Sequence, residues 1–323
     1  MRELKITMFG PRYVGKTSLL TAMYQQLEDK NRHISIQLTP DLNTSSTLGE
    51  RLAELKSLSE DFDASKGIAS SEAAAGPNSL RSFIFDLGKK GTKPSLRLHF
   101  QDYPGGYILT KDKEEQEFIK KLLTECVAVL IAIDAPSIME DKGKWHQHRN
   151  RSYEITDWFK RYYVDIKSPR LVILAPVKCE TYLQDSKSAL KLLQRIKQEY
   201  ANLLAFFKAD LLVSKVAVVV TPVQTVGNVF FSRIEVINGQ PHFFFSKQDY
   251  EAEYNPQDAE QPLKYLLRFL LKIHIQGQWG MFNFIRDLFG LDNELKEVAR
   301  EFAKDCKTTG GFEVIQGKNW LNI

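Results

Sequence analysis

The sequence predicts an α/β fold of three layers, with helices on both faces of a mainly parallel sheet. Short apolar segments alternate with longer amphipathic segments from the N-terminus to about residue 220, which is typical of such sheets. A glycine-rich turn joins the first expected strand to the first expected helix. Because ligands of these folds bind at the carboxyl ends of the strands, we expect the functional residues at that edge.

The composition narrows the class of protein. The chain has 323 residues, of which 43% are hydrophobic, enough for a sizeable core in one or two domains. Its net charge of +4 is too small to indicate a nucleic-acid partner. Three cysteines without metal-ligand spacing, and no signal-peptide pattern, favour the cytoplasm. The longest apolar run, Val127–Ile133, is too short to span a membrane, so any membrane contact would be peripheral.

The segment from Gly10 to Thr17 matches the phosphate-binding loop pattern, Gly, four residues, then Gly-Lys-Ser/Thr. An expected strand at Leu4–Phe9 precedes it and an expected helix at Ser18–Leu27 follows it. Backbone amides of this turn would cradle a β-phosphate, Lys16 would reach β and γ oxygens, and Thr17 would offer a hydroxyl to Mg²⁺. The residues expected to contact the nucleotide here are Gly10, Tyr13, Val14, Gly15, Lys16, Thr17 and Ser18.

A segment rich in serine, alanine and glycine, Ala64–Ser79, predicts a flexible loop. In a phosphate-loop hydrolase this is the place for a switch whose hydroxyl contacts Mg²⁺ only when a γ-phosphate is bound. Ser79 is the first candidate for that metal ligand, with Thr44 and Thr47 as alternatives. Each of the three is equally well explained as an ordinary loop hydroxyl.

Two expected strands, Leu80–Leu87 and Leu96–Phe100, form a hairpin that leads to Asp-Tyr-Pro-Gly at residues 102–105. The carboxylate of Asp102 would organise the water shell of Mg²⁺, and the amide of Gly105 would approach the γ-phosphate because glycine has no side chain. The other expected elements of the core are strands at 34–38, 128–134, 170–175 and 215–220 and helices at 48–58, 114–125, 155–164 and 188–207.

The strands at 170–175 and 215–220 each run into a polar segment, at Pro176–Glu180 and Thr221–Thr225. With the phosphate loop and the Asp-x-x-Gly sequence, these segments resemble the translation-factor-related (TRAFAC) class of P-loop GTPases over residues 4 to about 225. The Asp-Tyr-Pro-Gly form further resembles bacterial GTPases of the double-GTPase type, which occur in multi-gene stress and defence systems. The resemblance implies a Ras-like fold and a switch that binds GTP or GDP with Mg²⁺.

The same resemblance implies the base-binding residues. Lys178 would stack along the base, and Glu180 would accept hydrogen bonds from guanine N1 and N2. Thr221, Pro222 and the residues up to Gln224 would supply a backbone contact to the base.

Several positions depart from the pattern of that class. Val177 stands where Asn or Thr is usual, which removes a side chain that braces the phosphate loop, and Glu180 is one methylene longer than the usual Asp. Gly106 stands where many small GTPases have a Gln that orients the attacking water, so hydrolysis should be slow. Arg12 projects from the phosphate loop, where it would either neutralise transition-state charge or pair with a surface carboxylate while Tyr13 covers the nucleotide.

The remaining sequence adds to the nucleotide core. Residues 226–250 predict a β-hairpin with an Asn-Gly turn, whose aromatic side chains either pack on the domain or form a docking surface. A basic amphipathic helix at Leu263–Ile275 would close a GTPase domain of residues 1–275.

Residues 276–323 predict a helical C-terminal extension. It begins with an aromatic cluster at 279–289, which either packs in the core or contacts a protein partner or a membrane surface, and continues with a helix at 293–304. No histidine or cysteine cluster has metal spacing, and we expect His146 and His148 in a solvated loop.

These observations lead us to expect a cytoplasmic, Mg²⁺-dependent, GTP-binding switch with slow hydrolysis and a protein effector or activating partner. The candidate catalytic residues are Lys16, Asp102, Gly105 and Arg12, and the candidate metal ligands are Thr17, Ser79 and Asp102. An interaction module with negligible turnover stays open because of Gly106. A phosphotransferase would need an acceptor pocket and an arginine-bearing lid, and the Lys178–Glu180 pair argues against it.

Overall fold

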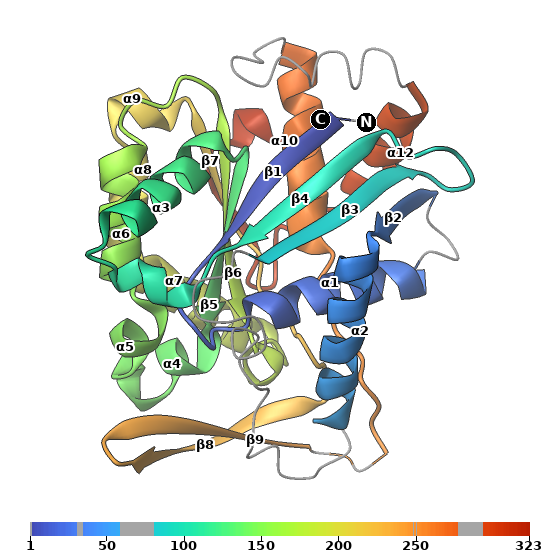
Figure 1. Cartoon of the computed structure of the whole chain (residues 1–323). Helices are drawn as coiled ribbons and strands as arrows, with labels where there is room; N and C mark the ends of the chain where they lie inside the picture. Colours follow the sequence, from blue (N-terminus) through green and yellow to red (C-terminus); the bar gives the residue numbers. More distant parts are fainter. Residues whose placement is uncertain (1, 31–34, 59–80, 248, 250, 277–292) are drawn as a thin grey trace.

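A computed structural model describes residues 2–30, 35–58, 81–247, 249, 251–276 and 293–323 (Figure 1). The strands of its central sheet are β1 (Arg2–Phe9), β2 (Ile36–Pro40), β3 (Arg81–Lys89), β4 (Leu96–Asp102), β5 (Ala128–Asp134), β6 (Arg170–Val177), β7 (Val216–Val220) and β10 (Glu313–Gln316). They form one eight-stranded sheet in the order β10-β7-β6-β5-β1-β4-β3-β2. The five strands β4, β1, β5, β6 and β7 are parallel, and β2, β3 and β10 are antiparallel to their neighbours.

Helices cover both faces of this sheet, as Figure 1 shows. They are α1 (Lys16–Lys30), α2 (Leu42–Ser57), α3 (Lys113–Glu125), α4 (Ala135–Met139), α5 (His146–Asn150), α6 (Ser152–Tyr162), α7 (Ser186–Glu199), α8 (Ala201–Phe207), α9 (Asp210–Val213), α10 (Gln261–Gln276) and α12 (Asn293–Ala303). One apolar core lies between the sheet and α1, α10 and α12, and a second lies between the sheet and α3, α6, α7 and α8. The predicted three-layer α/β fold is therefore confirmed.

The buried central strands limit where functional polar side chains can lie. β5 and β6 are buried at every residue, as expected of central strands with helices on both sides. Functional polar side chains next to these two strands must therefore lie in the loops that follow them. The phosphate loop follows β1, and the strands β4, β5 and β6 end at Asp102, Asp134 and Val177 on the same carboxyl edge.

The predicted hairpin forms a separate two-stranded sheet of β8 (Val229–Ile237) and β9 (Gln240–Lys247). Its turn residues Asn238 and Gly239 have φ of 52° and 76°, the left-handed conformation that a tight hairpin turn requires. In Figure 1 the hairpin runs along the bottom of the molecule, beyond the ends of β5 and β6 and next to α4 and α5. It therefore lies on the side of the sheet where ligands are expected.

Two helices differ from the sequence prediction in their extent. Helix α2 begins at Leu42 rather than near residue 48, because the Asp41 side chain caps it by accepting a hydrogen bond from the Thr44 amide. The helix expected at 188–207 is interrupted at the buried residue Tyr200.

The C-terminal extension is helical only in part, because β10 follows α12 and pairs with the edge of β7. Pairing with β7 satisfies backbone groups that an open sheet edge would expose. Within the described ranges no helix is long and apolar enough to cross a bilayer.

Candidate nucleotide-binding site

The phosphate loop makes a compact turn between β1 and α1. Gly10, Tyr13 and Gly15 have φ of 149°, 64° and 111°. Glycine adopts such angles readily, whereas a tyrosine in the left-handed region costs on the order of 1 kcal/mol. Tyr13 is 58% exposed, so burial of its side chain does not compensate for this cost. Strain of this kind is concentrated at functional sites, which agrees with a ligand-binding role for the turn.

The side chain of Lys16 curls back over this loop. Its Nζ donates hydrogen bonds to the carbonyl oxygens of Gly10 (2.8 Å) and Pro11 (3.2 Å), and it lies 3.6 Å from Oδ1 of Asp102. The lysine is only 7% exposed. A buried cation thus stands inside the loop, next to a carboxylate from the end of β4.

The Asp-Tyr-Pro-Gly segment is attached to the phosphate loop by Tyr103, a residue whose role the sequence analysis missed. The Tyr103 hydroxyl accepts a hydrogen bond from the Gly10 amide (3.2 Å) and lies 3.3 Å from the Gly10 carbonyl oxygen, to which it can donate. Its ring lies 5.0 Å from that of Phe9. Gly105, which begins a short 3-10 helix, packs directly on the backbone of Pro11 and Arg12.

Two of the predicted metal ligands lie in this centre. Thr17 is 8% exposed and Asp102 is 6% exposed, so a hydroxyl and a carboxylate stand beside the loop. A pair of hard oxygen ligands fits Mg²⁺, which is usually held by one or two protein groups together with phosphates and water. In the described part of the chain no group of three or more His, Cys, Asp or Glu residues would hold a metal by itself.

The candidates for the switch hydroxyl have a different outcome. Ser79 and the whole segment 64–79 lie outside the described residues. Thr44 lies in the first turn of α2, where its Oγ1 accepts a hydrogen bond from the Ile84 amide in the middle of β3. Thr47 belongs to the same helix. Thr44 is therefore a packing residue that joins α2 to β3, and its place there follows from the early start of the helix.

Lys178 reaches from the end of β6 to the phosphate loop. Its Nζ donates a hydrogen bond to the carbonyl oxygen of Tyr13 (3.3 Å) and forms an ion pair with Asp134. Lys178 has φ of 58°, so two non-glycine residues in left-handed conformations meet here. Val177 also touches the loop, because a Cβ on Gly15 would lie 3.0 Å from its Cγ2.

Glu180 lies in the expected loop, but its carboxylate is directed toward the protein backbone. Its Oε1 accepts hydrogen bonds from the amides of Val226 (2.8 Å) and Gly227 (3.2 Å), and the residue is 3% exposed. Burial raises the pKa of this carboxyl, while the backbone amides act in the opposite direction. The side chain thus joins the segment after β6 to the residues just before the hairpin, and its contact with guanine stays a prediction.

The backbone amides of the segment after β7 donate hydrogen bonds to other backbone groups of the protein. Thr221, Val223 and Gln224 donate to the carbonyl oxygens of Leu174, Pro176 and Gln257, and Pro222 has no amide hydrogen. A backbone contact from this segment to a base also stays a prediction.

Arg12 of the phosphate loop lies beside Gly106. A Cβ placed on Gly106 would lie 3.6 Å from both Nε and Nη2 of Arg12. The guanidinium therefore covers the position at which many small GTPases have a water-orienting glutamine.

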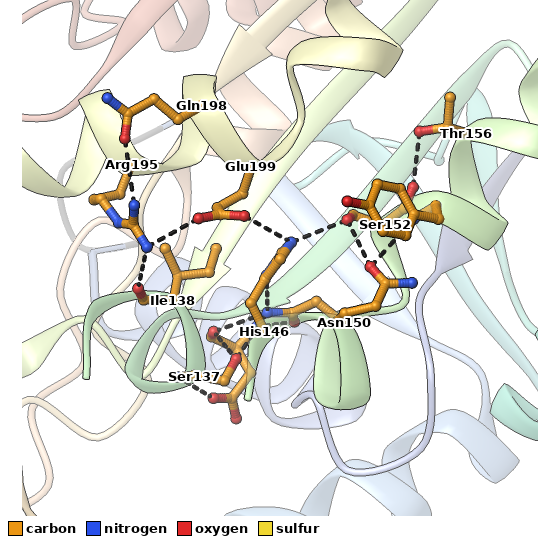
Figure 2. Close-up of polar contacts among 12 residues, drawn as sticks. Ser137, Ile138, His146, Asn150, Ser152, Thr156, Arg195, Gln198 and Glu199 are labelled. Carbon is orange, nitrogen blue, oxygen red and sulfur yellow. Dashed lines mark hydrogen bonds and ion pairs between the residues drawn. The ribbon is translucent and has the colours of Figure 1, made fainter. Parts of the chain in front are cut away.

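A buried polar cluster behind the loop corrects the expectation for His146. This histidine is 3% exposed, and its Nδ1 lies 3.1 Å from the Asn150 amide nitrogen while its Nε2 lies 3.0 Å from the Ser152 hydroxyl (Figure 2). Glu199 and Arg195 of α7 lie on the other side of the ring in the same view. Burial lowers the pKa of His146 to about 4. The histidine is enclosed because α5 and α6 pack this segment against the end of β5, whereas His148 is exposed as expected.

The sheet order and the phosphate loop together define the fold of a P-loop NTPase. No protein-family model matches the sequence, and no curated protein sequence matches it. Among solved structures, the GTPase-like domain of Ski7 from S. cerevisiae bound to GTP has 17% identity and a TM-score of 0.40, and the match covers 68% of this chain and 43% of that one. The SRb-GTP/SRX complex of the signal recognition particle receptor from Chaetomium thermophilum has 16% identity and a TM-score of 0.36, covering 70% and 92%. This chain thus spans less than half of the Ski7 chain, and similarity this low carries no conclusion about ligand or activity.

Proposed function

We propose that this protein binds guanine nucleotides with Mg²⁺ and hydrolyses GTP slowly as a molecular switch. The observation that carries the proposal is the position of Lys16 Nζ, 3.6 Å from Oδ1 of Asp102. These groups come from two motifs far apart in the sequence. A phosphate-loop hydrolase needs this arrangement, since a cation must face the β and γ phosphates beside the carboxylate that organises the metal ion.

Each residue of this centre has a separate role in the proposal. A bound Mg²⁺ would neutralise charge on the β and γ phosphates, and Thr17 and Asp102 would hold it. Lys16 would exchange its hydrogen bonds to loop carbonyl oxygens for bonds to phosphate oxygens. Gly105 would report the γ-phosphate through its amide, because it already packs on the loop.

Slow turnover follows from the position after this glycine. Gly106 has no side chain to orient an attacking water, and the guanidinium of Arg12 lies beside it. In this proposal Arg12 neutralises charge that develops in the transition state, as arginines do in assisted hydrolysis. If Arg12 instead serves a surface carboxylate, Arg12→Ala will leave the rate of phosphate release unchanged.

A switch also needs a protein that distinguishes its two states. We therefore include a protein effector or activating partner in the proposal, in the cytoplasm and within a bacterial multi-protein system. The support for this part is the sequence resemblance of the Asp-Tyr-Pro-Gly motif. The aromatic cluster at 279–289, the suggested contact with a partner or membrane, lies outside the described residues.

The deciding experiment combines nucleotide binding with phosphate release. Purified protein is titrated with a fluorescent GDP analogue, with and without Mg²⁺, and phosphate release from GTP is then followed over hours. Slow release supports the switch, whereas tight binding without release supports an interaction module. Phosphate transfer to an added small acceptor would indicate a phosphotransferase. Failure to bind any nucleotide would refute the proposal.

A further inference from the structure

Asp134, at the carboxyl end of β5, is held in place on several sides. Its side chain is 1% exposed, and Oδ1 accepts a hydrogen bond from the Ser137 amide at the start of α4 (3.0 Å). The Asn150 side chain binds its backbone, accepting from the amide (2.7 Å) and donating to the carbonyl oxygen (3.2 Å). The second carboxylate oxygen forms the ion pair with Lys178. A carboxylate fixed in this way sets the position of any cation that binds it.

Lys178, which is paired with Asp134, has a strained backbone and also contacts the phosphate loop. Lys178 adopts φ of 58°, and its Nζ donates to the carbonyl oxygen of Tyr13, which has φ of 64°. Left-handed conformations of residues with a Cβ persist only where surrounding contacts compensate for them. The ion pair with Asp134 compensates for the strained backbone of Lys178. The hydrogen bond from Lys178 likewise compensates for that of Tyr13.

The neighbouring residue explains why this path matters. Val177 packs on Gly15, but its side chain has no polar atom and cannot bond to the loop backbone. The polar contact from the end of β6 to the loop is made by Lys178 instead. The chain Asp134, Lys178, Tyr13 thus joins the ends of β5 and β6 to the phosphate loop.

We propose that Asp134 is a positioning residue of the nucleotide site, which fixes Lys178 and through it holds the phosphate loop in its binding geometry. The inference rests on the proposed function as far as nucleotide affinity is concerned. The simpler role, a helix cap for α4, uses only the oxygen that faces Ser137. The ion pair and the cap are therefore separable by substitution.

The test is a double-mutant cycle on GDP affinity with Asp134→Asn and Lys178→Met. Asparagine is a good helix cap, so Asp134→Asn keeps the contact with α4 and removes the charge. Each single substitution should weaken GDP binding about 10-fold, because a charge-assisted hydrogen bond is lost. The double variant should bind no worse than Lys178→Met, because the two residues act in series.

The matched control is Asp185→Asn. Asp185 caps α7 in the same way but faces the amides of Lys187 and Ser188, so its substitution should leave GDP affinity unchanged. Wild-type affinity in Asp134→Asn, or losses that multiply in the double variant, would overturn the inference.

A second readout needs no nucleotide and separates this inference from the proposed function. Backbone amides of Gly10 and of residues 12–15 should exchange with solvent faster in Asp134→Asn than in the wild type, whereas Asp185→Asn should not change them. If the wild-type protein binds no GDP, the proposed function fails, and the exchange rates still decide the role of Asp134. Unchanged exchange in Asp134→Asn would then refute it.

Discussion

Gly105 touches the phosphate loop so closely that a Cβ on this residue would lie 2.3 Å from the backbone nitrogen of Arg12 and 2.5 Å from the carbonyl carbon of Pro11. Neither atom belongs to a flexible side chain, so the contact leaves no room for any residue except glycine. The segment that would detect a γ-phosphate is therefore in direct contact with the loop that would bind it.

The first prediction is that Gly105→Ala impairs the site although it adds only one methyl group. The segment must move away from the loop, which should lower the free energy of unfolding by about 1–3 kcal/mol and slow GTP hydrolysis. Gly106→Ala is the control, because its Cβ would lie no closer than 3.6 Å to the Arg12 side chain. Urea unfolding is measured on both variants, and phosphate release is measured on Gly105→Ala. Equal behaviour of the two would contradict the close packing of Gly105.

Lys16→Met should weaken nucleotide binding without loss of the fold. The buried Nζ faces loop carbonyl oxygens and Asp102, and methionine keeps most of the stem without the charge. Loss of one charge-assisted contact to phosphate should reduce GDP affinity about 10- to 100-fold. Lys5→Met, which removes a partly exposed ion pair with Glu125, serves as the control. Unchanged GDP affinity in Lys16→Met would remove the phosphate-loop assignment.

The residues of this centre differ in how far the sequence could reveal them. Lys16 and Asp102 could be predicted, because each belongs to a short motif whose spacing fixes its place at a strand end. Tyr103 and Asp134 could not, because their roles depend on contacts with Gly10 and with Lys178 that no local pattern encodes. The signals available were a tyrosine inside the Asp-x-x-Gly motif and an aspartate that ends a buried strand.

Similar limits apply to the fold. The strands β1 to β7 were predictable because their apolar runs are bounded by turn residues. The early start of α2 was missed, and the signal that could have revealed it is Asp41, a residue type that commonly caps helices. β10 has only four residues, and it becomes a strand through pairing with β7. Edge strands of this length carry too little periodicity to be recognised from the sequence.

His146 should make the stability of the protein depend on pH. Its Nδ1 lies 3.1 Å from the side-chain nitrogen of Asn150, which can only donate, so protonation would place a second donor against that group. The pKa is about 4 in the folded state against 6.5 in the unfolded state, so between these values protons bind the unfolded chain preferentially. The stabilisation is complete above pH 6.5 and is lost as the pH falls toward 4, by about 3 kcal/mol in total.

The measurement is urea unfolding between pH 7 and pH 5, which lies inside that window. His146→Gln should flatten the pH dependence, whereas His148→Gln should keep it, since His148 is exposed on the same helix. Identical slopes in wild type and His146→Gln would show that other groups cause the dependence.

Glu180 binds backbone amides of the protein and is also the residue expected to select guanine over adenine. Its Oε1 already accepts hydrogen bonds from the amides of Val226 and Gly227. Glu180→Ala would leave these amides unpaired, so a loss of affinity could come either from the missing contact with the base or from a destabilised loop. Glu180→Gln is the sharper variant. Its carbonyl oxygen can keep both amides, while its NH₂ group places a donor where guanine also presents donors.

We expect GDP affinity to fall about 10-fold or more in Glu180→Gln and ADP affinity to change little, because adenine has an acceptor at N1 and no adjacent amine. Competition of GDP and ADP against a fluorescent guanine nucleotide gives both values. Thr181→Val is the control, since the Thr181 hydroxyl also binds the hairpin, at the Phe231 amide, without facing a base through a carboxylate. An equal loss for both nucleotides would assign Glu180 to loop packing alone. If ADP competes as well as GDP on the wild-type protein, the site is that of a phosphate-loop NTPase without guanine selectivity.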